Sequence, residues 1–324
     1  MKVVTILDKG NFNKYGGNIF SSLEVVNLEA SKLNEEEVIK SGADAILVDP
    51  MITITRDVIS KMPNLKIIQS FGVGFNQIDL EAAKERGIYV CNNAGVNSGA
   101  VAEQAVMLML AVLRRYHAGE KAVYKAKQGE FKNYCFNNGL KELSECNVGL
   151  LGMGAIGKEV ALRLKPFGCK VYYHDVFPLS NPEEYNVEYK NQKELFSQCD
   201  IISLHLPVLP DTVNIINDET ISLMKKGVII INTSRGELVN QEDLCMALKD
   251  GRIEGFGADT LAPEPVRADN PILALPEDTK NRIALSPHIG GITEQTFYRS
   301  YNKAFSNINA VFNGNRPSNI VNKL

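Results

Sequence analysis

The sequence predicts an α/β protein with two doubly wound parallel sheets, each covered by helices on both faces. Two observations support this class. Short apolar strand signals alternate with single helix signals over residues 1–99 and again over residues 147–285, and a glycine-rich loop opens the second series. At 324 residues, the chain is long enough for two domains with full cores.

The first series of elements predicts one complete α/β domain. Its expected strands cover residues 3–7, 23–28, 43–48, 65–69 and 88–91. Three residues between them can cap the start of a helix with their side-chain oxygens: Asn34, Thr55 and Asp79. A helical pattern from Thr293 to about Phe312 is expected to return to the same domain. The predicted domains are therefore residues 1–99 plus 297–324, and residues 100–296.

The segment between the two series predicts a buried helix and a polar extension. Apolar residues occur nearly all round the helix expected from Val101 to Leu113, so most of its sides must be buried. Residues 117–141 are polar and carry four aromatic side chains. They are expected either to form an arm across a neighbouring subunit or to lie as a loop on their own domain.

The second series begins with a loop that predicts a Rossmann-like dinucleotide site. Its strands are expected near residues 147–151, 169–174, 200–204, 227–232, 254–258 and 282–285. After the first of them, Gly152 permits a tight turn, Gly154 leaves room for a pyrophosphate, and Gly157 lets the helix pack closely. The helix begins at Ala155 and Ile156, whose backbone N–H groups can bind phosphate.

An acidic residue at the end of the next strand indicates which dinucleotide is bound. Asp175 lies 18 positions after Gly157 and can accept a hydrogen bond from an adenosine ribose hydroxyl. Its negative charge would repel a 2′-phosphate, so the sequence predicts NAD rather than NADP. Glycines also mark ordinary turns, but here the strand, the helix and the acid occur together.

Polar clusters follow four later strands, at the sheet edge where α/β proteins bind ligands. The clusters are His205-Leu-Pro207, Asn232-Thr-Ser-Arg-Gly236, Asp259 and Ser286-Pro-His288. Arg235 is either a planar charged fork for a carboxylate and a carbonyl oxygen or a solvated turn residue. Glu264, between two prolines, is either a fixed carboxylate that orients another group or part of a rigid surface turn. Among the four histidines, His288 is the best candidate for a general acid or base.

Composition and charge argue against several classes of protein. A net charge of −3, a pI near 5.9 and the lack of a basic cluster argue against a nucleic-acid surface. Six cysteines without a C-x-x-C spacing indicate free thiols in a reducing compartment rather than a metal site. The apolar start is too short for a signal peptide, and no apolar run approaches the ~20 residues needed to span a bilayer. We therefore expect a cytoplasmic protein with a small-molecule partner.

Taken in order, these motifs resemble those of the D-isomer-specific 2-hydroxyacid dehydrogenase family, and the resemblance covers essentially the whole chain. The matching segments are Ser70-Phe-Gly-Val-Gly74, Val101-Ala-Glu103, the glycine loop with Asp175, His205–Pro207, Asn232–Gly236, Asp259 with Glu264, and Pro287-His288-Ile-Gly-Gly291. The family pattern implies a substrate domain from both chain ends, a central NAD domain, and a homodimer through the central helix and its arm. It also implies hydride transfer between NAD(H) and C2 of a small D-2-hydroxy or 2-oxo acid.

The resemblance further implies roles for individual residues. Arg235 would bind the 2-oxo acid, His288 would exchange the proton, and Glu264 would orient His288. The backbone of Val73 and Gly74 would hold the substrate carboxylate. Further cofactor contacts are implied at a set of residues near the strand ends, with Asp259 facing the nicotinamide carboxamide: His205, Pro207, Thr212, Thr233, Ser234, Asp259 and Gly290.

Departures from the family's subgroups narrow the expected substrate. Glu264 stands where formate-specific members have glutamine, and residues 48–53 lack the cation found in phosphoglycerate-oxidising members. Both substrates are therefore disfavoured. Two rival functions stay open on the sequence: an NADH-sensing, corepressor-like binding protein, and a dehydrogenase of an inorganic anion such as phosphite.

Overall fold

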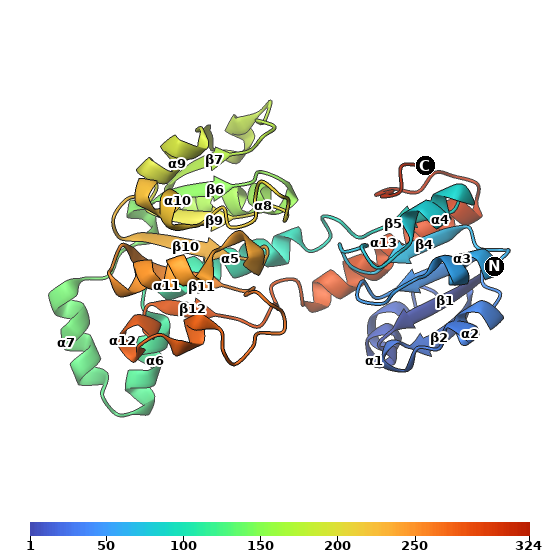
Figure 1. Ribbon diagram of the computed structural model, residues 1–324, viewed down its shortest axis with the longest axis horizontal. Coiled ribbons are helices and arrows are strands. Elements are labelled where there is room, and N and C mark those ends of the chain that lie inside the picture. Colours follow the sequence, from blue (N-terminus) through green and yellow to red (C-terminus); the bar gives the residue numbers. More distant parts are fainter. The chain divides into compact units, whose positions relative to one another are not determined.

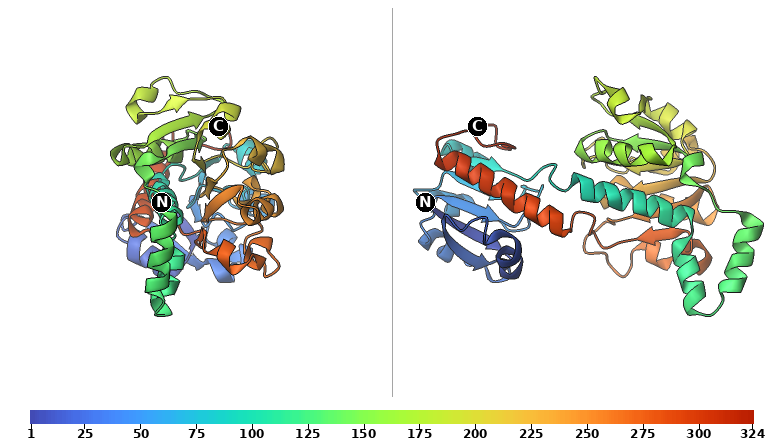
Figure 2. Two further views of the ribbon diagram at one scale, coloured as in Figure 1. Left: turned by 90° about the vertical axis from the view of Figure 1, so that its left-hand side faces the viewer. Right: turned by 180° about the vertical axis from the view of Figure 1, so that it is seen from behind.

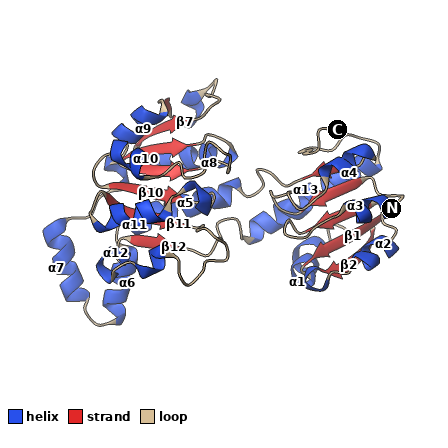
Figure 3. Cartoon of the chain, in the orientation of Figure 1, coloured by secondary structure: helices blue, strands red, loops and turns tan.

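The computed structural model describes all 324 residues, which form two compact units. Met1–Asn97 and Ile292–Leu324 make up the terminal unit, and Ser98–Gly291 make up the central unit. Each unit contains one parallel sheet with helices on both faces (Figures 1 and 3). The predicted fold class, with two doubly wound parallel sheets, is confirmed.

The sheet of the terminal unit has five parallel strands in the order β2-β1-β3-β4-β5. The strands are β1 (Lys2–Leu7), β2 (Glu24–Glu29), β3 (Ala45–Val48), β4 (Ile67–Ser70) and β5 (Tyr89–Cys91). Their side chains alternate between the two faces, so Val4 and Ile46 join one apolar cluster while Val3 and Leu47 join the other. The first face is covered by α2 (Glu35–Lys40), α3 (Arg56–Lys61) and α4 (Leu80–Glu85). The second is covered by α13 (Glu294–Phe312), together with α1 (Lys9–Asn11) and the π-helix Phe12–Gly16.

The predicted helix starts of the terminal unit are confirmed. Each capping side chain accepts a hydrogen bond from a backbone N–H in the first turn: Asn34 from Glu36, Thr55 from Val58, and Asp79 from Ala82. Thr293 caps α13 in the same way, through the N–H of Thr296. Such caps satisfy donors that the first turn of a helix leaves unpaired, which is why a few adjacent residues are enough to place them.

The sheet of the central unit has seven parallel strands in the order β12-β11-β10-β9-β6-β7-β8. The strands are β6 (Asn147–Leu151), β7 (Lys170–His174), β8 (Glu188–Tyr189), β9 (Ile201–Leu204), β10 (Val228–Asn232), β11 (Ile253–Ala258) and β12 (Ile283–Leu285). One face is covered by α9 (Gln192–Gln198), α10 (Asp218–Leu223) and α11 (Gln241–Lys249), and the other by α5 (Ser98–Leu113) and α8 (Ala155–Leu164). The strand order reverses beside β6, where doubly wound sheets bind ligands.

Helix α5 is buried on most of its sides, as its sequence predicts. It packs against α8 and against β11, whose glycines allow a close approach. A Cβ atom on Gly255 would lie 2.4 Å from Val112 Cγ1, and one on Gly257 would lie 3.1 Å from Leu108 Cβ. Glycines in this strand therefore let the helix axis come near the sheet.

Residues 117–141 contain two helices that the sequence does not predict. Helices α6 (Tyr116–Tyr124) and α7 (Gln128–Asn138) form a hairpin that extends away from the rest of the central unit (Figure 2). No residue of α7 is buried within the chain. The segment is therefore a helical hairpin rather than a loop, although α6 does contact its own unit, where Ala118 is buried and Lys121 pairs with Glu277. The sequence does not predict these helices because neither has a long row of apolar residues that packs against the core of this chain.

The six cysteines are all free, and five of them are buried. Burial raises the pKa of the Cys91 and Cys199 thiols to about 12, so these groups stay protonated and unreactive at neutral pH. No helix is both long enough and apolar enough to cross a membrane.

Candidate active site

The glycine loop after β6 shows what each of its glycines is needed for. Gly152 has a φ of +94°, and a Cβ there would lie 2.5 Å from His205 O. A Cβ on Gly157 would lie 2.3 Å from Gly152 O. The chain's own backbone therefore excludes a side chain at both positions. At Gly154 no atom lies within 4 Å of the added Cβ. That space is open to a bound group.

The start of α8 and the neighbouring acid complete a surface that fits a dinucleotide. Gly154 is the N-cap of α8, and no side chain caps the helix there. The first N–H groups, at Ala155 and Ile156, are therefore left for an anion. The Asp175 carboxylate accepts from Met153 N at 2.7 Å and from Phe177 N at 2.9 Å. It is thus fixed beside the loop in the position expected for a ribose contact.

Three buried polar atoms just past strand ends of the central sheet have no partner within the chain: His205 Nδ1, Thr233 Oγ1 and Thr260 Oγ1. Such atoms are rare in folded proteins and often mark a ligand site. The other nitrogen of His205 lies 3.0 Å from Ser203 Oγ. Desolvation lowers the pKa of His205 to about 3, so this imidazole is neutral at physiological pH. It can contact a cofactor but cannot serve as a proton donor there.

Other residues expected at the cofactor are engaged by the chain itself. Ser234 Oγ donates to Leu204 O at 2.8 Å. Thr212 Oγ1 donates to Pro207 O at 2.7 Å and accepts from Leu209 N at 2.7 Å. These bonds order the loops that follow β9 and β10. In this structure Ser234 and Thr212 shape the loops, and direct cofactor contacts by them stay predictions.

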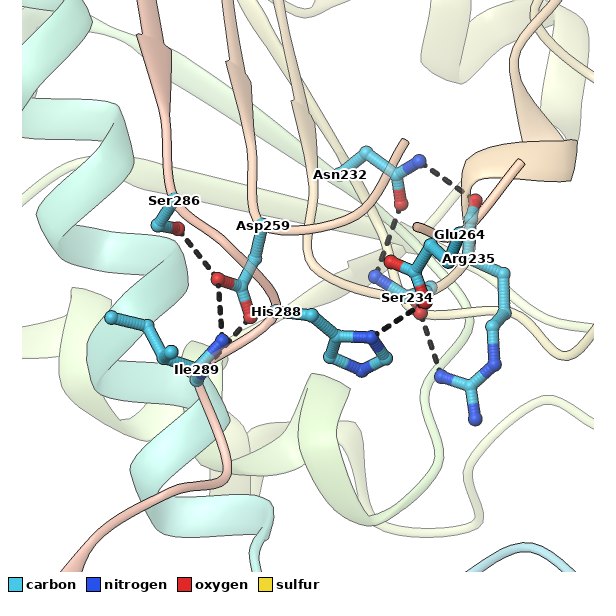
Figure 4. A network of polar contacts seen from close by, with 9 residues as sticks. Asn232, Ser234, Arg235, Asp259, Glu264, Ser286, His288 and Ile289 are labelled. Carbon is cyan, nitrogen blue, oxygen red and sulfur yellow. Dashed lines mark hydrogen bonds and ion pairs between the residues drawn. The ribbon is translucent and has the colours of Figure 1, made fainter. Parts of the chain in front are cut away.

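His288 and Glu264 form a hydrogen-bonded pair at the ends of two neighbouring strands. His288 Nδ1 lies 2.8 Å from Glu264 Oε2 (Figure 4). The side chains are 47% and 40% exposed, respectively. Because Nδ1 faces the carboxylate, its hydrogen donates there and Nε2 is left for another partner. The sequence places the two residues 24 positions apart, and the adjacency of β11 and β12 brings them together.

The backbone of His288 is held in an unusual conformation by Asp259. Its φ is +56°, in the left-handed region that non-glycine residues rarely adopt. Its N–H donates to Asp259 O at 2.7 Å. The Asp259 carboxylate accepts from Ile289 N at 3.0 Å, from Gly290 N at 2.8 Å and from Ser286 Oγ at 2.5 Å. This buried acid therefore holds the loop that carries His288, a role that sequence analysis missed, and its contact with the cofactor stays a prediction.

A further residue supports the same loop from helix α5. Gln104 Nε2 donates to Ser286 Oγ at 2.7 Å, and the side chain also lies against Gly290. A Cβ on Gly290 would lie 3.2 Å from Gln104 Cβ and 2.9 Å from Asp259 Oδ2. No local sequence signal could have identified Gln104, because it lies 182 positions before Ser286.

Arg235 lies at the end of β10, next to the strand that leads to Glu264. Its backbone O accepts from Asn232 Nδ2 at 2.8 Å, and its own guanidinium donates to Ser234 O at 2.8 Å. A Cβ on Gly236 would lie 2.2 Å from Ala262 N, so the arginine loop packs directly on the loop that carries Glu264. Figure 4 shows the guanidinium on the same side of the sheet edge as the His288–Glu264 pair. The side chains of Arg235, Glu264 and His288 thus lie in the loops that follow three neighbouring strands, β10, β11 and β12.

Val73 and Gly74 lie in the terminal unit, in the loop after β4. Neither of their backbone N–H groups donates a hydrogen bond within the chain. Adjacent free N–H groups can bind an anion, as expected for a carboxylate-binding loop.

Substituting Gly154 by valine is expected to weaken NADH binding at least about tenfold, or about 1.4 kcal/mol, without lowering Tm appreciably. A Cβ atom on residue 154 meets nothing within 4 Å, so the valine side chain is expected to enter the space predicted for the pyrophosphate. Isothermal titration with NADH and thermal unfolding would measure the two effects. Gly129→Val is the matched control, since nothing lies within 4 Å of a Cβ there either. Unchanged affinity in Gly154→Val would contradict the cofactor site.

Comparison with known proteins identifies the family. Residues 106–290, more than half of the chain, match the profile described as D-isomer specific 2-hydroxyacid dehydrogenase, NAD binding domain. A hydroxypyruvate reductase of Blautia hydrogenotrophica is 34% identical over 301 residues, which cover 92% of each chain. A glyoxylate reductase of Thermofilum pendens is 35% identical over 90% of this chain and 85% of its own.

A solved structure agrees over nearly the whole length. It is the NAD complexed form of a D-isomer specific 2-hydroxyacid dehydrogenase from Lactobacillus delbrueckii ssp. bulgaricus. The TM-score is 0.86 at 27% identity, and the match covers 99% of this chain and 100% of that one. The predicted cofactor NAD and the predicted enzyme class, hydride transfer involving a small 2-hydroxy or 2-oxo acid, are confirmed. With its glycine loop, its acid–imidazole pair and these relatives, the chain belongs to the D-isomer specific 2-hydroxyacid dehydrogenase family.

Proposed function

We propose that the protein reduces a short 2-oxo acid of the glyoxylate and hydroxypyruvate type with NADH, giving the corresponding hydroxy acid. The observation that carries this proposal is the 2.8 Å contact between His288 Nδ1 and Glu264 Oε2, which leaves Nε2 as the proton donor. Support for the short substrate comes from the relatives, which are a hydroxypyruvate reductase and a glyoxylate reductase.

The proposed residue roles follow from charge and geometry. Bound NADH supplies the hydride. As C2 of the oxo acid is reduced, its oxygen gains negative charge, and the Arg235 guanidinium stabilises that charge. His288 Nε2–H donates a proton to the same oxygen, while Glu264 stabilises the charged imidazolium before the transfer. For oxidation of the hydroxy acid, neutral His288 accepts the proton at Nε2.

Other groups are proposed to hold the two reactants. The backbone N–H groups of Val73 and Gly74 bind the substrate carboxylate, and Arg235 also pairs with it. Gly154, Ala155 and Ile156 bind the pyrophosphate of the cofactor. Additional cofactor contacts are proposed for Asp175 at the ribose and for a set around the strand ends: Gly152, Gly157, His205, Pro207, Thr212, Thr233, Ser234, Asp259 and Gly290.

A substrate screen tests this function. NADH oxidation is measured with glyoxylate, hydroxypyruvate, pyruvate and longer 2-oxo acids, and the highest kcat/KM is expected for one of the first two. Folded protein that binds NADH but reduces none of these acids would reject the proposal. Phosphite-dependent NADH formation would indicate an inorganic-anion dehydrogenase instead. NADH-dependent capture of a partner without turnover would indicate a sensor.

We further propose that the protein is a homodimer through α5 and the hairpin α6–α7. In the single chain, α7 buries none of its side chains. Two aromatic residues of the hairpin, Tyr124 and Phe136, are 83% and 89% exposed. Surface aromatics at this density are typical of an interface.

The double variant Tyr124→Glu/Phe136→Glu is expected to shift the protein from dimer to monomer, because it places charge on surfaces that need apolar contact. Analytical ultracentrifugation over a range of concentrations would measure the change. Met246→Glu is a suitable control, since this exposed apolar residue lies on α11 in the same unit. A wild-type monomer, or a variant that stays dimeric, would refute this interface. A cytoplasmic location is also proposed, supported by the six unpaired thiols.

A further inference from the structure

In the loop after β4 in the terminal unit, each backbone carbonyl of the segment Phe71–Gly74 is hydrogen-bonded to the protein. Each of the four accepts one hydrogen bond: Phe71 O from Asn93 Nδ2 at 2.7 Å, Gly72 O from Asn93 N at 2.9 Å, Val73 O from Asn92 Nδ2 at 2.7 Å, and Gly74 O from Ser70 Oγ at 2.6 Å. Three of these four bonds come from two consecutive asparagines, Asn92 and Asn93, which directly follow β5.

The N–H groups of the same four peptide units, at Gly72 to Phe75, are left without partners within the chain. A peptide unit is rigid, so fixing its carbonyl also fixes the direction of the N–H on its other side. The bonds to the carbonyls therefore determine where the free N–H groups point. They hold a row of donors ready for an anion, at no reorganisation cost when the anion arrives.

The two asparagines are themselves held firmly. Asn92 is 4% exposed, and its Oδ1 accepts from Ala94 N at 3.2 Å, which orients its NH2 group toward Val73 O. Asn93 is 2% exposed, and its NH2 group also donates to Ser300 O on α13 at 3.2 Å. Through Gln69, whose Nε2 lies 3.3 Å from Asn93 Oδ1, the pair joins a buried network that reaches Asn307 of α13.

We propose that Asn92 and Asn93 are positioning residues that set the orientation of the carboxylate-binding N–H groups in the loop 71–74. This inference rests on the proposed function, in which Val73 and Gly74 bind the substrate carboxylate. The asparagines touch neither substrate nor cofactor, and they act through the peptide units of the loop. Their removal is therefore expected to affect substrate binding more than the chemical step.

Asn322 offers a matched control for a test at Asn92. Both side chains are 4% exposed and lie in the same unit. Asn322 donates to Ile88 O at 2.8 Å and accepts from Val90 N at 3.1 Å, which closely matches the bonding of Asn92. Its partners are Ile88, directly before β5, and Val90 on β5, rather than residues of the loop. Loss of either asparagine should therefore cost similar stability, but only Asn92 is tied to the carboxylate-binding amides.

The experiment compares Asn92→Leu with Asn322→Leu in the full-length protein. Asn92→Leu is expected to raise KM for glyoxylate, hydroxypyruvate and pyruvate by a similar factor, roughly tenfold or more. All three acids carry the same carboxylate, and in the variant a hydrogen bond from the loop amides to this charged group is lost or bent. The Kd for NADH and the kcat should change less than about threefold, and the inhibition constant of oxamate should rise with KM. Asn322→Leu should lower Tm similarly but leave KM near the wild-type value.

Each other outcome has a definite meaning. If the wild type reduces no 2-oxo acid, the proposed function fails. If the wild type is active but KM is unchanged in Asn92→Leu, or rises equally in Asn322→Leu, the positioning role is overturned. If Asn92→Leu does not fold, Asn92→Asp and Asn322→Asp repeat the test with isosteric side chains. Asn92→Asp keeps the acceptor for Ala94 N, removes the donor to Val73 O and adds a negative charge, which Asn322→Asp adds as well.

Discussion

Replacement of His288 by alanine is expected to lower kcat by about 10²- to 10⁴-fold, the usual contribution of a general acid. The affinity for NADH should stay nearly unchanged, because the loop is held by Asp259 through backbone atoms and not through the imidazole. Steady-state kinetics with the best 2-oxo acid would measure kcat, and quenching of NADH fluorescence would measure binding. Together, the two readouts separate loss of the proton donor from loss of the cofactor site.

The chain contains a closely matched control histidine. His117 is also 47% exposed and lies near a glutamate that is 40% exposed, but the His117 Nδ1–Glu120 Oε2 distance is 3.9 Å. That distance is too long for a hydrogen bond, and the residue lies on α6. His117→Ala should therefore keep wild-type turnover. Comparable kcat values in the His288→Ala and His117→Ala proteins would refute the role of His288.

The Glu264→Gln variant tests whether Glu264 acts by orienting the His288 ring or through its negative charge. Glutamine can still accept a hydrogen bond from His288 Nδ1, so the ring keeps its direction, but the negative charge that stabilises imidazolium is lost. The kcat for 2-oxo acid reduction should therefore fall, since the carboxylate no longer offsets the positive charge of the proton-donating imidazole. A kcat equal to that of the wild type would show that the carboxylate charge does not matter.

Arg235→Gln is expected to lower kcat/KM for the 2-oxo acid by about 10²- to 10³-fold, as seen when a donor to a developing oxyanion is removed. The guanidinium is exposed at the edge of the sheet and makes only one bond within the chain, to Ser234 O. Its loss should therefore cost little stability. Both kcat and KM should suffer, because the same group binds the ground-state carboxylate and the transition-state oxygen.

A second arginine in the same region provides the comparison. Arg267 is exposed and lies in the loop between β11 and β12, three positions after Glu264. Arg267→Gln removes the same charge from nearby surface and should change kcat/KM only slightly. Equal losses in the two variants would point to a general electrostatic effect on a charged substrate. Arg235→Lys should recover only part of the activity, because an ammonium lacks the planar fork.

Much of the fold could be predicted because its signals are local. Strand and helix patterns occupy short windows, and the caps at Asn34, Thr55 and Asp79 need only a few adjacent residues. The hairpin α6–α7 could not be predicted, because its apolar residues do not face a core of this chain. Strand β8 was not predicted for a different reason. It has only two residues, both exposed, and so short a segment cannot show the alternation of apolar and polar residues that identifies a strand.

The candidate site also contains residues that could be predicted from the sequence and contacts that could not. Gly152, Gly154 and Gly157 could be assigned from spacing, since the strand–turn–helix unit that uses them is continuous in sequence. Arg235, Glu264 and His288 could be chosen by residue type and by position after a strand. The bonds of Asp259 to the His288 loop, and those of Asn92 and Asn93 to the loop after β4, could not be anticipated. They depend on which strands are neighbours.

The amino-acid sequence by itself determined the α/β class, the NAD-type loop and the list of chemically able side chains, because those features depend on residues close together along the chain. Only the tertiary structure decided that the Asp259 carboxylate binds the His288 loop and that Gln104 supports that loop from 182 positions away. It also decided that two asparagines bind the carbonyl groups of the loop 71–74, whose amides donate to no atom of the chain. Hydrogen bonds reach only about 3 Å, so strand order must bring such partners together before they can act.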